Sequence, residues 1–257
     1  MNIDLSGRTA LVTGSTAGIG AAVAAALGAA GAEVVVNGRN AERVAETAGR
    51  LGARGVAADV GTLEGCEALI RQIPEVDILV NNSGIFATQP VFEIPDEEWL
   101  RFFRVNVLSG IRLARHYAPR MAGRKWGRVV FVSSEAGVQT PTDMAHYGMT
   151  KTAQLAVSRG MAQELAGTGV TVNCVLPGPT MSDGVLAMFG ELYPGVDAVE
   201  QERRFVTEGR ASTSLLRRLI RPEEVASLVT YVASDRSAAT TGAALSVDGG
   251  LVPTIFP

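Results

Sequence analysis

The sequence of 257 residues lacks the features that mark several large classes of protein. Its two cysteines, Cys66 and Cys174, have no zinc-like spacing and no companion cysteines, so no metal site is expected. No apolar run reaches the roughly 18 residues that span a bilayer. The N-terminus has neither the basic nor the apolar region of a secretory signal. These absences exclude a membrane role and make the cytoplasm the expected compartment.

Excess charge is also missing. A net charge of −3, with 19% charged and 47% hydrophobic residues, describes a soluble globular protein and argues against nucleic-acid binding. The one exception is the stretch between Arg101 and Arg128, which contains eight basic residues and no acidic one. Such a run is most often a solvated face or an interface, and docking of an acidic partner is the alternative.

What the sequence does contain is a regular alternation of short apolar strands and helices. Strands are expected at 8–13, 33–37, 55–58, 77–81, 129–132, 169–176 and 244–247. Helices are expected at 21–30, 42–51, 63–73, 96–117, from 147 onward, and from 221 onward. This alternation predicts one Rossmann-type α/β domain over residues 1–257, a doubly wound parallel sheet of about seven strands with helices on both faces.

A glycine-rich stretch follows the first strand. Gly14, Gly18 and Gly20 lie between a strand and a helix, where backbone N–H groups and the positive helix end can hold a pyrophosphate. Glycine is required there because a Cβ would block close approach of the phosphate. The spacing G-x-x-x-G-x-G differs from the common G-x-G-x-x-G. An ordinary glycine-rich turn is the alternative, but the flanking strand and helix favour a nucleotide site.

Polar residues at other strand ends should face the same crevice, because ligands bind beyond the carboxyl ends of parallel strands. Asp59 could accept a hydrogen bond from an adenine amino group, or it could belong to a helix N-terminal cap. Asn81 to Gly84 end the fourth strand, although Asn-rich turns are also common for local reasons. The segment 177–180 ends the sixth strand. Residues 181–216 are irregular with weak helical segments, and we interpret them as a substrate lid.

The most specific pattern is Tyr147 followed four residues later by Lys151. The pair shares one helix face, so the ammonium can lie beneath the phenol and lower its pKa towards the working pH, as acid/base catalysis requires. Ser133 and Ser134 end the preceding strand and could bind the same substrate oxygen. Asn106 stands among apolar residues, where its amide needs a partner in the backbone or in the site.

With these motifs laid out, the chain resembles the short-chain dehydrogenases/reductases, in the single-domain branch that includes the 3-oxoacyl-carrier-protein reductases. The resemblance extends from about residue 5 to 250. Its motifs occur in the family order: Thr13-Gly14-x-x-x-Gly18-Ile19-Gly20, Asn81-Asn82-Ser83-Gly84, Asn106, Ser134, Tyr147-x-x-x-Lys151, Pro177-Gly178 and Val247-Asp248-Gly249-Gly250. Two departures are Ser83, where the family has alanine, and the segment 179–182.

The resemblance implies a role for each matching residue. Tyr147 would donate or accept the proton, Lys151 would lower its pKa and bind the nicotinamide ribose, Ser134 would polarise the substrate oxygen, and Asn106 would hold a water. Thr180 and Ser182 would contact the nicotinamide carboxamide. The cofactor contacts implied are Gly14, Ser15, Thr16, Gly18, Ile19, Gly20, Arg39, Asp59, Val60, Asn81, Ser83, Gly84, Tyr147, Lys151, Pro177, Gly178, Thr180 and Ser182.

The implied chemistry is hydride transfer between a nicotinamide dinucleotide and a small-molecule carbonyl or alcohol. NADP(H) is the expected cofactor, because Gly38 offers no carboxylate at the end of the second strand and Arg39 suits a 2′-phosphate. Ala17, where NADP-specific relatives often carry a basic residue, leaves NAD(H) possible. The substrate could be an acyl thioester on a carrier protein or a small ketone, sugar or steroid. A non-catalytic dinucleotide-sensing regulator is the other alternative, and a homotetramer is the expected assembly.

Overall fold

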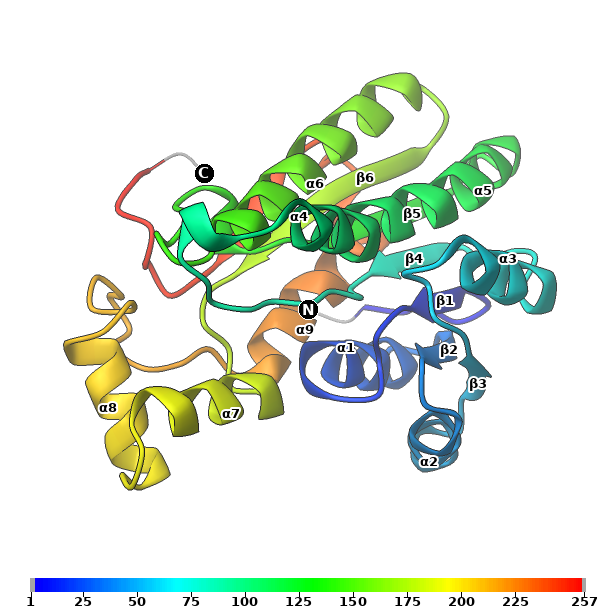
Figure 1. The fold of residues 1–257 in the computed structure, drawn as a ribbon. Helices are drawn as coiled ribbons and strands as arrows, with labels where there is room; N and C mark the ends of the chain where they lie inside the picture. The colour runs from blue at the N-terminus through cyan, green and yellow to red at the C-terminus, as the bar shows by residue number, and fades with distance from the viewer. Residues whose placement is uncertain (1–2, 256–257) are drawn as a thin grey trace.

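All strands of residues 3–255, which the structure describes, run parallel in one seven-stranded sheet (Figure 1). The structure is a computed structural model. Its strands lie in the order β3-β2-β1-β4-β5-β6-β7. In chain order they are β1 (Thr9–Val12), β2 (Glu33–Gly38), β3 (Arg54–Ala57), β4 (Ile78–Asn81), β5 (Gly127–Val132), β6 (Val170–Pro177) and β7 (Ala244–Val247). The predicted sheet is therefore confirmed.

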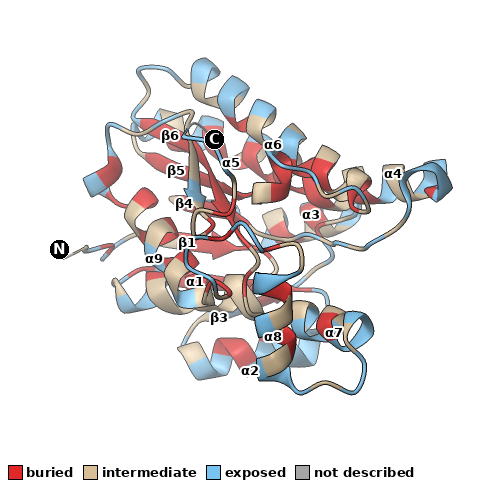
Figure 2. Ribbon diagram, turned by 90° about the vertical axis from the view of Figure 1, so that its left-hand side faces the viewer, coloured by how far each residue is buried: buried red, intermediate tan, exposed pale blue. Residues whose placement is uncertain are grey.

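Helices cover both faces of this sheet, and Figure 2 shows their buried sides turned towards the strands. The helices are α1 (Gly18–Ala29), α2 (Ala41–Leu51), α3 (Leu63–Gln72), α4 (Asp96–Phe103), α5 (Ser109–Gly123), α6 (Ala145–Glu164), α7 (Asp183–Leu192), α8 (Ala198–Thr207) and α9 (Pro222–Val232). One face packs against α1, α2 and α9, and the other against α3, α5 and α6. None of the helices in the described chain is long and apolar enough to cross a membrane.

The central strands read as continuous apolar runs because both of their sides are buried. Along β5, Val130 and Val132 pack on the side of α1 and α9, whereas Val129 and Phe131 pack on the side of α5. The strand order reverses between β1 and β4. In such sheets the loops beyond the carboxyl ends diverge at that point and open a crevice.

The expected helix at 96–117 is continuous but longer and locally widened. It consists of α4, a π-helical turn η2 (Arg104–Leu108) and α5, which ends at Gly123. A π-turn accommodates one extra residue per turn and is frequent at functional sites. Here the turn contains Asn106, whose buried side chain faces the loop after β4.

The segment 181–216 is more regular than the sequence analysis expected. It forms α7 and α8, which pack through Phe189 and Phe205 with ring centroids 4.8 Å apart. The two helices share a small apolar cluster with the segment before α9 and with the chain near its C-terminus: Phe189, Phe205, Val206, Ala211, Leu219 and Leu251. Their helical signal in the sequence is weak because this cluster depends on residues far away along the chain.

Candidate active site

Side-chain hydrogen bonds tie the end of β4 to the loop after β1. The Thr13 Oγ1 accepts from the backbone N–H groups of Asn82 and Ser83, each at 3.0 Å. The Asn82 amide donates in turn to the carbonyl oxygens of Thr13 and Gly14, also at 3.0 Å. Asn82 was expected at the crevice within the segment 81–84 but not among the cofactor contacts, and its side chain joins the two loops.

The glycine loop is tightly packed at all three glycines. A Cβ on Gly20 would stand 2.3 Å from the Gly14 carbonyl oxygen, and one on Gly14 would stand 3.1 Å from the Ser83 Cα. Gly14 and Gly18 have positive φ angles of 62° and 52°. A Cβ on Gly18 would lie 3.4 Å from the Ser182 Cβ. The loop therefore faces both the end of β4 and the first residues of the lid, as a cofactor cradle requires.

Two of the predicted cofactor contacts, Ser15 and Asn81, have buried side chains. Ser15 is fully buried, its hydroxyl donates to the Val12 carbonyl at 2.7 Å, and its N–H donates to the Asn37 carbonyl at 2.9 Å. Both the hydroxyl and the backbone N–H of Ser15 thus donate to carbonyl oxygens of the protein. Asn81 is buried with its Cγ 3.2 Å from the position of a Cβ on Gly110, so its side chain faces α5 and only its backbone can line the crevice.

The end of β2 lies beside the glycine loop. A Cβ on Gly38 would stand 2.8 Å from the Thr16 Cγ2 and 3.3 Å from its Oγ1, so the two predicted contact positions are neighbours. Arg39 is exposed, and its guanidinium makes no hydrogen bond or ion pair with the described residues. The Arg39 guanidinium is therefore available to an anion near Thr16. Ile19, another predicted contact, is partly buried against the core under α1.

Asp59 and Val60, two predicted cofactor contacts, follow β3 and have different surroundings. Asp59 is exposed, and its Oδ1 accepts from the Gly61 N–H at 3.0 Å, which leaves Oδ2 available. The N-cap of α3 is Thr62 rather than Asp59. Val60 is a buried core residue, so only its backbone can contribute to a binding site.

The end of β6 carries Pro177 and Gly178 towards β7. A Cβ on Gly178 would stand 2.8 Å from the Asp248 Cα, which explains why glycine is needed there. The Thr180 hydroxyl is buried and donates to the Gly178 carbonyl at 2.8 Å, which leaves its oxygen able to accept a further hydrogen bond. Ser182 is the N-cap of α7, where its Oγ accepts from the Val185 N–H.

The two adjacent serines at the end of β5 have different surroundings. The Ser133 hydroxyl is buried and donates to the Lys151 carbonyl at 2.9 Å, which anchors α6 to the strand. Ser134 lies next to the phenol of Tyr147, and its Oγ donates to the Glu135 carboxylate and accepts from the Ala136 N–H. Ser134, as expected, is therefore the serine that faces the reacting groups.

Tyr147 and Lys151 lie in the first two turns of α6, with the Lys151 Nζ 5.5 Å from the centre of the phenol ring. The Nζ donates to the Val132 carbonyl at 2.9 Å and lies 3.7 Å from the position of a Cβ on Gly84. The pair thus bridges the ends of β4 and β5. The edge of Phe86, from the loop after β4, covers the ring of Tyr147 at 6.3 Å between centroids.

The pKa of Tyr147 moves in the direction opposite to the one expected. Burial raises it above its ordinary value, the Glu135 carboxylate raises it further, and the Ser134 hydroxyl acts in the other direction. Burial also lowers the pKa of the Lys151 ammonium to about 8. Desolvation is the largest cause of both shifts, because burial disfavours the charged form of either group.

Asn106 supports the loop after β4. Its Oδ1 accepts from the Ile85 N–H at 2.8 Å, and its Nδ2 donates to the Ile85 carbonyl and to the Thr150 Oγ1. The Asn106 carbonyl accepts from the Gln154 side chain at 2.6 Å. The buried amide is therefore satisfied, and it connects the π-turn to both the crevice loop and α6.

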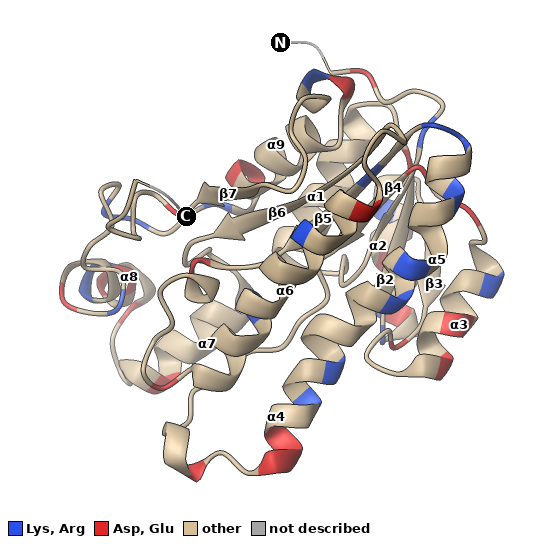
Figure 3. Ribbon diagram, turned by 90° about the horizontal axis from the view of Figure 1, so that it is seen from above, with Lys and Arg blue, Asp and Glu red and all other residues tan. Residues whose placement is uncertain are grey.

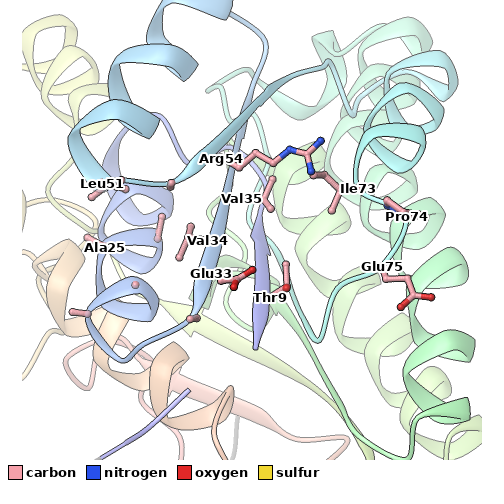
Figure 4. Close-up of a pocket in the computed structure, with 16 residues that line it drawn as sticks. Thr9, Ala25, Glu33, Val34, Val35, Leu51, Arg54, Ile73, Pro74 and Glu75 are labelled. Carbon is pink, nitrogen blue, oxygen red and sulfur yellow. The ribbon is translucent and has the colours of Figure 1, made fainter. Parts of the chain in front are cut away.

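Two surface features lie away from these residues. An open groove of about 820 Å³ runs along the amino-terminal ends of β1, β2 and β3, at the edge opposite the site (Figure 4). The basic residues of the stretch 101–128 lie along α4, α5 and the start of β5 (Figure 3), and three of the eight form ion pairs with described acidic residues. Arg101 pairs with Glu98, Arg124 with Glu75 and Asp77, and the buried Arg128 with Asp235.

Known proteins share both the sequence and the fold of this chain. An uncharacterized oxidoreductase of Bacillus subtilis, YvaG, is 50% identical over 265 residues, covering all of both chains. The 3-oxoacyl-acyl-carrier-protein reductase of Escherichia coli is 32% identical over 255 residues, covering 97% of this chain and 99% of the relative. L-sorbose reductase from Gluconobacter frateurii, complexed with NADPH and L-sorbose, has a TM-score of 0.94 at 31% identity, covering 99% of this chain and 100% of that chain.

The family assignment follows from these comparisons together with the geometry. Residues 8–188 match the family of short chain dehydrogenases. This range includes the glycine loop, the end of β4, and the residues Ser134, Tyr147 and Lys151 that converge beyond the strands. The chain belongs to the short-chain dehydrogenase family of oxidoreductases.

Proposed function

We propose that the protein is an NAD(P)(H)-dependent oxidoreductase that interconverts a carbonyl compound and an alcohol, with Tyr147 as the proton donor and acceptor. The observation that carries this proposal is the convergence of Ser134, Tyr147 and Lys151 beside the end of β4. The three groups come from β5 and α6, and they lie next to the loop that contains Gly84.

The glycine loop fits a dinucleotide. Gly14 and Gly20 let the loop pack closely against the end of β4, Gly18 begins α1, whose N-terminal end is positive, and Ser182 lies opposite Gly18. A bound nicotinamide would supply or take the hydride. Asp59, the exposed Arg39 and the backbone near Gly84 are the residues proposed to hold the adenosine part.

The protein side chains would handle the substrate oxygen and its proton. Ser134 would donate a hydrogen bond to the carbonyl oxygen, which polarises the bond. The raised pKa of Tyr147 keeps the phenol protonated, as a donor to a developing alkoxide must be. The Lys151 ammonium would bind ribose hydroxyls and favour the ionised phenol after transfer. Asn106 keeps its proposed role next to a water, with its amide positioned by Ile85.

NADP(H) is the proposed cofactor, because an unpaired Arg39 follows a glycine at the end of β2. A guanidinium binds a phosphate through paired charge-assisted hydrogen bonds. Steady-state kinetics with NADPH and NADH test this preference in the wild type and in Arg39→Leu. The wild type should show the higher kcat/KM with NADPH, and Arg39→Leu should lose most of that advantage. A higher kcat/KM with NADH in the wild type would contradict the proposal.

A change of cofactor preference from NADPH to NADH should require two substitutions. An aspartate at position 38 would favour NADH, but its Cβ would stand 2.8 Å from the Thr16 Cγ2. Gly38→Asp should therefore be combined with Thr16→Ala, and the double variant should prefer NADH. Gly38→Asp alone is the matched control and should bind either cofactor more weakly.

A small ketone is proposed as the substrate rather than an acyl group on a carrier protein. One structural neighbour is bound to L-sorbose, a polyhydroxy ketone. The basic stretch 101–128, where a carrier protein would dock, already pairs three of its arginines with acidic residues. Loss of NADPH absorbance with a panel of ketones, compared with a carrier-bound 3-oxoacyl thioester, tests the choice. No described residue favours the regulator hypothesis.

A further inference from the structure

Glu135 is a carboxylate placed at the reacting groups that the proposed chemistry does not use. It begins the short turn η3 (Glu135–Gly137) directly after Ser134, and the Ser134 Oγ donates a short hydrogen bond to its Oε2. The turn is held against α6, because the Thr152 hydroxyl donates to the Gly137 carbonyl at 2.7 Å. A Cβ on Gly137 would stand 2.9 Å from the Lys151 carbonyl carbon. The carboxylate therefore has a fixed place beside Ser134.

The protein gives this carboxylate hydrogen bonds but no cationic partner among the described residues. No ion pair within 4.0 Å involves Glu135 among residues 3–255, and Ser134 is the one side chain there that donates to it. Burial raises the pKa of Glu135, and the nearby Asp248 acts in the same direction. Asp248 itself is satisfied, since its two oxygens accept from the N–H groups of Gly250 and Val252.

The partly buried carboxylate accepts from the Ser134 hydroxyl and from the backbone N–H groups of Glu135 and Ala136, but it has no cationic partner among the described residues, so a further donor on a ligand would stabilise its charge. Ser134 connects the two groups, because its Oγ bonds to Glu135 and lies next to the Tyr147 phenol. The Glu135 carboxylate therefore lies on the Tyr147 side of the site, where a substrate would bind.

The Ser134 hydroxyl has a single proton to donate. In the free protein this proton is directed to Glu135, whereas polarisation of a substrate carbonyl requires it to point at the substrate. A substrate hydroxyl that donates to Glu135 would replace Ser134 there and release the serine proton. Because Ser134 and Glu135 are hydrogen-bonded neighbours, one substrate can bind both when its hydroxyl lies close to its carbonyl, and a hydroxyl on the carbon next to the carbonyl is the most compact such arrangement.

We propose that Glu135 determines substrate specificity by binding the hydroxyl of an α-hydroxy ketone, or of a vicinal diol in the reverse direction. The inference rests on the proposed carbonyl reductase function. In the reduction, the carbonyl carbon gains a hydride from the reduced nicotinamide, and its oxygen gains the Tyr147 proton. A vicinal diol and oxidised nicotinamide result. The hydroxyl at Glu135 keeps its bonds, and Glu135 neither gains nor loses a proton overall.

A hydroxyl suits this position better than an ammonium group. A hydroxyl can donate to an ionised carboxylate and can accept from a protonated one, whereas an ammonium only donates and needs the ionised form. Burial raises the pKa of Glu135 and Asp248 acts in the same direction, so an ammonium group, which needs the ionised form, is the less suitable donor. The amino analogue of the substrate is therefore a discriminating control.

The test compares kcat/KM for acetone, hydroxyacetone and aminoacetone with NADPH. The wild type should prefer hydroxyacetone over acetone by about 100-fold or more, since a site built to bond a hydroxyl rejects analogues that lack it. Glu135→Leu should reduce that ratio to within about tenfold, whereas Glu135→Gln, which keeps an acceptor oxygen, should retain most of it. Glu46→Leu, an exposed carboxylate on α2, is the matched control and should leave the ratio unchanged.

The outcomes separate this inference from the proposed function. If the wild type binds NADPH but reduces none of the three ketones nor any other carbonyl compound, the proposed function itself is wrong. If it reduces acetone and hydroxyacetone equally well, prefers aminoacetone, or keeps its ratio in Glu135→Leu, the role of Glu135 alone is refuted. Should Glu135→Leu fail to fold, the wild-type ratios and Glu135→Gln still decide the question.

Discussion

Replacing Lys151 by methionine should change how the stability of the protein depends on pH. Lys151 is 4% exposed, and burial lowers the pKa of its ammonium to about 8 from an ordinary value of 10.5. At 1.36 kcal/mol for each pH unit, holding the ammonium charged in the folded state costs roughly 3 kcal/mol below pH 8. Methionine has a similar length and volume without the charge, so the variant is free of this cost.

The sign of the effect follows from the protons bound in each state. Between about pH 8 and pH 10.5 the unfolded wild type keeps the lysine proton, whereas the folded protein has lost it. The free energy of unfolding of the wild type therefore rises with pH in this window, and that of Lys151→Met does not share the rise. Between pH 7 and pH 9.5 the wild type should gain about 2 kcal/mol relative to the variant.

Equilibrium urea unfolding at the two pH values, at one protein concentration, measures this difference. The lost hydrogen bond to the Val132 carbonyl shifts the variant by a similar amount at both pH values, so it cancels in the comparison. The only other lysine, Lys125, is exposed, and Lys125→Met is the matched control that should show no such change. A difference between wild type and Lys151→Met that stays constant from pH 7 to pH 9.5 would refute the reasoning.

Four further predictions concern activity, dynamics and assembly. Tyr147→Phe should lower kcat/KM by about 10²–10⁴-fold while the dissociation constant for NADPH stays nearly unchanged; a variant that keeps more than about a tenth of the rate would assign the proton to another group. The wild-type kcat/KM for carbonyl reduction should fall above about pH 8, where the Lys151 ammonium loses its proton, and a flat profile to pH 10 would contradict this. Without ligands, amide hydrogens of 181–216 should exchange faster than those of the strands, and equal protection would indicate a fixed pocket wall. Light scattering at micromolar concentration should show a homotetramer, or at least a dimer, because the apolar side chains of Phe92 and Leu100 near α4 are exposed in the single chain; a monomer would disprove it.

Much of the fold was predictable because its signals are local. The runs that became β1, β5 and β6 are apolar along their whole length, as strands buried on both faces must be. The glycine loop and the pair Tyr147 and Lys151 could also be read from spacing within a few residues. Their placement at one edge of the sheet followed from the rule that parallel strands direct their carboxyl ends together.

The choice between neighbouring residues of the same type depended on the tertiary structure. Ser133 and Ser134 are equivalent in the sequence, but only the Ser133 hydroxyl donates to the Lys151 carbonyl, which lies 18 residues further along the chain. Ser15 looked like a phosphate ligand until β2 brought Asn37 within hydrogen-bonding distance. Such assignments require knowing which strands and helices become neighbours.

The sequence by itself determined the strands, the glycine loop and the pairing of Tyr147 with Lys151 on one helix face, since each shows in a pattern of residues close together in the chain. Only the tertiary structure decided the two helices within 181–216 and the direction in which the pKa of Tyr147 moves. It also placed Glu135 beside Ser134 without a basic partner among the described residues. The physical reason is that burial and charge depend on segments far apart in the sequence, and these set the electrostatics of the site only after the chain has folded.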